Sequence, residues 1–144
     1  MSTFTVDSLL GRPALKRNES RSSLDWITVI RRNLRASVVD LVTAATGVSR
    51  AELLRSLGFA EQTIARRKKA DGLLSQDETE KLVRFVCMTV RASEVFEDDE
   101  AALNWLRAPN ASLAGHRPLD MLDTGIGARA VADTLGRIQH GVFS

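Results

Sequence analysis

An unbroken row of four cationic side chains, Arg66, Arg67, Lys68 and Lys69, ends the segment LGFAEQTIARRKK of residues 57–69. Neighbouring like charges repel and point in different directions around a helix, so the row does not stabilise the helix that carries it. Arginine and lysine side chains neutralise the phosphates of nucleic acids. The row therefore points to a polyanionic partner, although a solvated helix face or a complement to the helix C-terminus would also place cations there.

The charges of the chain are divided between its two halves. The net charge of the 144 residues is only +2. Residues 1–70 hold 13 Lys and Arg against 6 Asp and Glu, whereas residues 71–144 hold 7 against 12. This asymmetry predicts two separate tasks, and it assigns contact with the polyanion to the N-terminal half.

Side chains that could support catalysis do not group along the sequence. His116 and His140 lie far apart, and neither has acidic neighbours at the spacing of metal ligands. Gly125-Ile126-Gly127 lacks the preceding strand that a dinucleotide-binding loop requires. Cys87 has no second cysteine with which to form a disulfide or a thiolate zinc site. We therefore expect a protein that is not an enzyme and that uses no cofactor and no metal ion.

The composition predicts a soluble globular protein of the cytoplasm. Apolar residues make up 44% of the chain, which is enough to form a core. No stretch approaches the roughly 18 consecutive apolar residues of a membrane span, and the N-terminus lacks the apolar segment of a secretory signal. We expect no contact with a membrane.

The N-terminal part is expected to begin as a flexible basic arm and to continue as helix. Residues 1–22 contain GRPALKRNESRSS and show weak periodicity, with brief ordering around Val6–Leu10 left open. Apolar residues then recur at helical spacing and stop at Gly47, and Asn33 leaves open whether they form one helix or two. The predicted buried stripe comprises Leu24, Ile27, Ile30, Leu34, Val38, Leu41 and Ala45.

Two short helices joined at Gly58 match the helix-turn-helix pattern. Ser49 and Glu52 have the spacing of a capping box, which predicts a helix start. A second helix follows over 62–70, with Ile64 on its inner face. We therefore expect residues 23–73 to form a helix-turn-helix domain whose second helix enters the major groove of DNA.

The polar side chains of this second helix are the candidate DNA-binding residues. Gln62 and Thr63 stand early enough in the helix to reach base edges, and Arg66 is suited to guanine or phosphate. Because one such module contacts little DNA, we expect a homodimer on a two-fold operator. Flanking phosphates are expected to contact Arg67, Lys68 and Lys69.

The segment 74–100 is predicted to be a long connecting helix followed by an acidic turn. Ser75 and Glu78 repeat the capping box, and apolar residues keep helical spacing to about Phe96. The acidic run 97–100 favours the positive N-terminus of a next helix, which begins the domain 101–144.

The remaining chain is compact and rich in turns. A helix over 101–107 is followed by a helical turn at 118–122 and by a final helix framed by Gly125 and Gly127. No useful length of Val and Ile alternates with polar residues, so the predicted fold is all-α. The final helix is expected to bury Ile126, Val131, Leu135 and Ile138.

The order of motifs in residues 103–144 resembles a known family. The segment is similar to the toxin-binding domain of Xre-type antitoxins of the MbcA/ParS/Xre group, and the helix-turn-helix half, including TIARRKK and LSQDE, resembles the same proteins. The matching positions are Trp105-Leu106, Pro109-Asn110, Leu113, Gly115, Pro118-Leu119, Leu122, Gly127, Val131, Leu135, Ile138 and His140-Gly141.

The resemblance implies a function in two parts. Such antitoxins occlude the active site of RES-domain toxins that consume NAD⁺, and they bind the operator of their own operon. The alternative is a stand-alone helix-turn-helix regulator with a dimerising C-terminal domain. The turns and the tail of the last domain are the candidate toxin-binding residues: Asn110, His116, Arg117, Asp120, Gln139, His140, Gly141 and Phe143.

Overall fold

The computed structural model describes residues 2–10 and 23–141. Within these ranges the one β-type pairing is an isolated bridge between Arg35 and Leu73, so the predicted all-α fold is confirmed. The elements in chain order are α1 (Val6–Leu10), α2 (Ser23–Arg32), α3 (Val38–Thr46), α4 (Arg50–Leu57), α5 (Glu61–Lys69), α6 (Gln76–Phe96), α7 (Asp99–Leu106), η1 (Ala111–Leu113), η2 (Pro118–Met121) and α8 (Gly125–Gln139).

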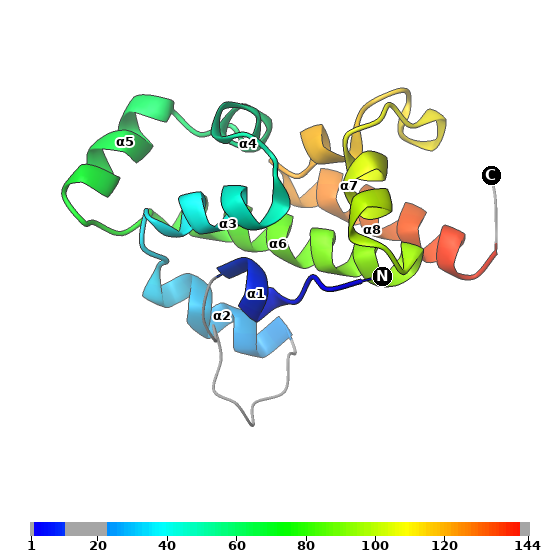
Figure 1. The fold of residues 1–144 in the computed structure, drawn as a ribbon, viewed down its shortest axis with the longest axis horizontal. Helices are drawn as coiled ribbons and strands as arrows, with labels where there is room; N and C mark the ends of the chain where they lie inside the picture. The colour runs from blue at the N-terminus through cyan, green and yellow to red at the C-terminus, as the bar shows by residue number, and fades with distance from the viewer. Residues whose placement is uncertain (1, 11–22, 142–144) are drawn as a thin grey trace.

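The 21-residue helix α6 runs through the middle of the molecule, and the other elements pack around it (Figure 1). The predicted capping box starts it: the Ser75 hydroxyl accepts the N–H of Glu78 at 3.1 Å, and the Glu78 carboxylate accepts the N–H of Ser75 at 2.8 Å. Helices α1 and α2 contact α6 from the N-terminal part of the chain, and α7 and α8 contact it from the C-terminal part. The fully buried Phe85 of α6 belongs to a core shared by both parts.

The ordering left open around Val6–Leu10 is found as helix α1, so the flexible-arm prediction does not hold there, and residues 11–22 lie outside the described part of the chain. Leu9 and Leu10 of α1 are 0% and 2% exposed, and they belong to the main core. The Asp99 carboxylate accepts the backbone N–H of Phe4 at 3.1 Å. Two adjacent leucines are too few to show a helical period in the sequence. Burying each of their side chains nevertheless stabilises the fold by about 1.5–3 kcal/mol.

The stripe predicted across α2 and α3 is also partly wrong. The helix is interrupted after Arg32, where Asn33 has φ +60°, and a second helix begins at Val38. The apolar residues of α2 and α3 therefore do not form one continuous helical stripe. Ile27 and Leu41, which we expected to be buried, are 40% and 46% exposed. Val38 is buried as predicted, and the rest of the buried face is made by Val29, Val39 and Val42.

Candidate functional site

Helix α5 lies at one end of the molecule, and the C-terminal end of α8 lies at the other (Figure 1). Gly58 ends α4 with φ +74°, a left-handed conformation that favours glycine, and allows the tight turn into α5. The fully buried Ile64 anchors α5 to the core. Gln62 and Arg66 are exposed, and Thr63 is half-buried. This surface has the arrangement that the helix-turn-helix pattern predicts.

The four-cation row is split by its internal contacts. Arg67 donates to the Glu78 carboxylate that caps α6, and Lys68 forms an ion pair with Asp40 of α3. Within the described part of the chain, Arg66 and Lys69 form no ion pair. Two of the four predicted phosphate contacts are therefore held by acids of the chain itself, which the sequence pattern did not indicate. Arg66 and Lys69 remain the cations of the row that are free to meet a phosphate.

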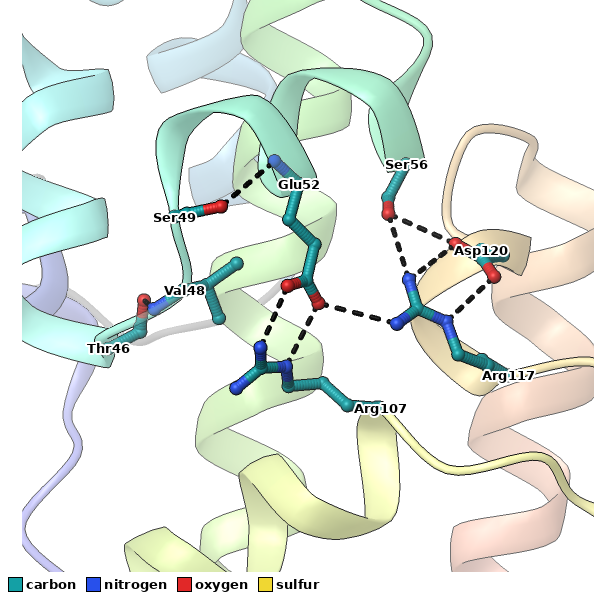
Figure 2. A network of polar contacts seen from close by, with 8 residues as sticks. All are labelled: Thr46, Val48, Ser49, Glu52, Ser56, Arg107, Arg117 and Asp120. Carbon is teal, nitrogen blue, oxygen red and sulfur yellow. Dashed lines mark hydrogen bonds and ion pairs between the residues drawn. The ribbon is translucent and has the colours of Figure 1, made fainter.

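A polar network joins α4 to the C-terminal module (Figure 2). The Glu52 carboxylate accepts from Nε and Nη2 of Arg107 at 2.9 and 2.8 Å, and from Nη1 of Arg117 at 3.4 Å. The Ser49 hydroxyl accepts the N–H of Glu52 as predicted, but the carboxylate turns to the two arginines instead of completing the capping box. Glu52 is thus the hub between the two modules.

Arg117 extends this network to η2. Its guanidinium donates to both oxygens of Asp120 at 2.8 and 2.9 Å, and the Ser56 hydroxyl donates to Asp120 at 3.0 Å. The hydrogen bond from Arg107 lowers the pKa of Glu52, and the hydrogen bond from Arg117 lowers the pKa of Asp120. Both carboxylates are therefore held in the charged form that binds arginine.

The other candidate toxin-binding residues occupy two places. Asn110 caps η1 through its side-chain oxygen, which accepts the N–H of Ser112 at 2.8 Å, and His116 is exposed beside it. Gln139, His140 and Gly141 are exposed at the end of α8. The structure thus brings Arg117 and Asp120 into an internal network and leaves the α8 end open. Phe143 lies outside the described residues.

The start of α8 departs from the predicted apolar face. Thr124 caps the helix by accepting the N–H of Gly127 at 3.0 Å. A Cβ at Gly127 would lie 2.0 Å from the carbonyl oxygen of Met121, so this glycine permits close contact with η2. Ile126, which we expected in the core, is 88% exposed. The side of α8 that packs against η2 is the one that carries Gly127, so the adjacent Ile126 points away from it.

One cavity of about 420 Å³ lies between the N-terminal segment and α6. Trp26 and Cys87 form part of its wall. Burial raises the pKa of the Cys87 thiol to about 11, so the thiol remains protonated near neutral pH and is a poor nucleophile. The cavity wall therefore offers packing surface and no reactive group at this position.

The described residues offer neither a metal site nor a membrane span. They contain no group of three or more His, Cys, Asp or Glu side chains placed to hold a metal ion. None of the helices in these ranges has both the length and the apolar character needed to cross a membrane.

Comparison with known proteins gave two family matches. Residues 25–86 match the antitoxin Xre-like helix-turn-helix domain, and residues 91–141 match the antitoxin Xre/MbcA/ParS C-terminal toxin-binding domain. The α4–α5 surface therefore falls in the first match and the end of α8 in the second.

Three relatives cover most of the chain. An antitoxin Xre of Yersinia enterocolitica is 33% identical over 116 residues, which are 80% of this chain and 78% of the relative. An antitoxin Xre of Photorhabdus laumondii is 30% identical over 117 residues, 81% and 79% of the two chains. A Sphingobium protein named Prs ADP-ribosylating antitoxin is 26% identical over 132 residues, 85% and 83% of the two chains.

Proposed function

This chain belongs to the family of Xre antitoxins, and on that premise we propose that it neutralises a cognate RES-domain toxin that degrades NAD⁺ and represses its own operon. Family membership itself shows that the chain is an Xre-type antitoxin of a toxin–antitoxin system and that it has a helix-turn-helix domain. The identity of the toxin, the occlusion of its active site and the autoregulation are the parts that we add.

The observation that carries the proposal is the separation of two accessible surfaces. Arg66 and Lys69 are exposed on α5, whereas Gln139, His140 and Gly141 are exposed at the end of α8. Helix α5 and the end of α8 lie at opposite ends of the molecule (Figure 1). The end of α8 lies in the module whose family description names toxin binding, and α5 lies in the module described as a helix-turn-helix, a motif whose second helix can enter the major groove of DNA.

The name of one relative supports a toxin that acts on NAD⁺. The Sphingobium protein is named for ADP-ribosylation, a reaction in which NAD⁺ is the donor of the transferred group. A RES-domain toxin that consumes NAD⁺ uses the same substrate. The two activities differ in the acceptor, so the fate of NAD⁺ in intoxicated cells distinguishes them.

Co-expression tests the toxin part of the proposal. The adjacent reading frame should arrest growth and deplete cellular NAD⁺ when it is expressed alone, and this chain should restore both. A chain that lacks residues 139–144 should lose protection while retaining operator affinity. Full protection by the shortened chain would refute occlusion by the end of α8.

Operator binding tests the DNA part. We expect a homodimer, acting in the cytoplasm, to bind a two-fold site upstream of its own gene, with half-sites roughly one helical turn apart. The mass of the protein–DNA complex measures the stoichiometry. If the adjacent reading frame is harmless and the operator is still bound, the chain acts instead as a stand-alone regulator.

A further inference from the structure

A second cavity, of about 390 Å³, lies where the C-terminal half of α8 passes α6. We call it the Arg91 pocket. Its lining residues are Arg91 of α6, Ala132, Asp133, Gly136 and Arg137 of α8, and the following His140. Two guanidinium groups and an imidazole thus surround one carboxylate, so the pocket has a net positive charge.

The Arg91 side chain is exposed and has no partner of its own. Within the described part of the chain, Arg91 makes no hydrogen bond and no ion pair. Glu94 lines the cavity of about 420 Å³ together with Arg91 but forms no ion pair with it. Its Nη2 atom would lie 3.5 Å from a Cβ at Gly136. The guanidinium therefore lies over the one lining position of α8 that has no side chain. A glycine inside a helix is less stable than alanine, and here it leaves the space above it open.

Arg137 is held on the same side of α8. Its Nη2 donates to the Thr134 hydroxyl at 3.2 Å, and it forms no ion pair within the described residues. Asp133, one helical turn earlier, is exposed and unpaired within the same ranges. The two arginines can therefore receive an anionic group without first breaking an internal ion pair.

The position of the pocket selects the class of partner. All six lining residues lie within residues 91–141, the part that matches the toxin-binding domain. Helix α5 lies at the opposite end of the molecule, so DNA bound there does not approach the pocket (Figure 1). A protein carboxylate suits an arginine because the planar fork of the guanidinium can hold both oxygens.

We propose that the Arg91 pocket receives an Asp or Glu side chain of the cognate toxin, with Arg91 as the anchoring residue. This inference rests on the proposed function, since it names a contact of that same interface. It adds a binding position on the flank of α8 that faces α6, which shares only His140 with the candidate residues of the turns and the tail. The contact should contribute most to the rate of dissociation, because it is a directed pair inside a pocket.

The test compares charge removal at the two ends of the molecule. The full-length Arg91→Ala variant should bind the purified toxin at least about tenfold more weakly than the wild type, as expected for the loss of a charge-assisted pair, and its operator affinity should be unchanged. Arg66→Ala is the matched control, and it should weaken operator binding while leaving toxin affinity intact. Isothermal titration with the toxin measures the affinities.

A second variant fills the pocket without removing a cation. Gly136→Glu places a carboxylate beside Arg91. The fold should be retained, as a melting curve will verify, because the added Cβ meets only the flexible end of the Arg91 side chain at 3.5 Å. Toxin affinity should fall by a similar factor. Wild-type toxin affinity in either folded variant would overturn the inference while the proposed function stood. Failure of the wild-type chain to bind the toxin would overturn the proposed function, and the inference with it.

Discussion

Replacing Glu52 by glutamine tests whether the hub of the polar network holds the two modules together. The Glu52 side chain is only 12% exposed, and its carboxylate accepts two short hydrogen bonds from Arg107 and a longer one from Arg117. A glutamine keeps the volume of the side chain but offers a single oxygen and an NH₂ group. That NH₂ group would face arginine donors, so at least one donor would be left without an acceptor.

The magnitude follows from the exposure of the two partners. A hydrogen bond to a charged group contributes about 1.5–3 kcal/mol, but an exposed ion pair contributes only about 0–1 kcal/mol. Arg107 is 42% exposed and can regain water, whereas Arg117 is 26% exposed and keeps Asp120 as a partner. We therefore expect a loss of about 2 kcal/mol in the free energy of unfolding, or a fall in Tm of roughly 4–8 °C for a chain of this size.

The dependence on pH gives this prediction a second readout. The pKa of Glu52 is lowered in the folded state, so its stabilising effect is present above the ordinary carboxyl pKa, about 4.3, and is lost as pH falls through the lower folded value. The difference in Tm between wild type and Glu52→Gln should shrink at acidic pH. Thermal unfolding followed by circular dichroism, with the exposed Glu61→Gln as control, measures both effects. An unchanged Tm at neutral pH would refute the role of Glu52.

Three other substitutions test separate parts of the structure. Arg66→Ala should lower the salt slope of operator binding by about 0.9 for each phosphate that the protein no longer neutralises, whereas Arg67→Ala should mainly lower Tm because it unpairs the capping carboxylate of α6. Trp105→Ala should cost less than the roughly 3–5 kcal/mol of a buried aromatic, since Trp105 is half-buried against Phe96, with ring centres 5.8 Å apart; urea unfolding measures it. Gly127→Ala should destabilise the C-terminal module by bringing a Cβ onto a carbonyl oxygen of η2, and a wild-type melting curve would contradict that close approach.

Helix boundaries were predicted well where the signal lies within a few residues. Ser75 and Glu78 form both hydrogen bonds of the capping box, and Gly47 and Gly58 end their helices with φ of +75° and +74°. These features depend on neighbours in the sequence, so spacing alone reveals them. The same reasoning does not reach α1, because its five residues are too few to show a period and are held by packing on the core.

The sites were predicted less completely because their partners are distant in the sequence. Arg107 and Arg117 reach Glu52 from 55 and 65 residues away, and Arg67 reaches Glu78 across a turn. The sequence around a charged residue does not show whether its partner lies within the protein or outside it. Exposed Arg66 and paired Arg67 are adjacent and chemically identical, and only the packing of α5 beside the start of α6 separates their roles.

The length of α6 determines how the two proposed activities combine. Its 21 residues span about 31 Å at 1.5 Å per residue, and α5 and the end of α8 lie beyond its opposite ends (Figure 1). A toxin on α8 and an operator on α5 therefore do not compete for one surface. The repression that we propose for the toxin–antitoxin complex requires this separation. Since the Glu52 network fixes α4 against the C-terminal module, the distance between the two surfaces is set by packed contacts rather than by a loose linker.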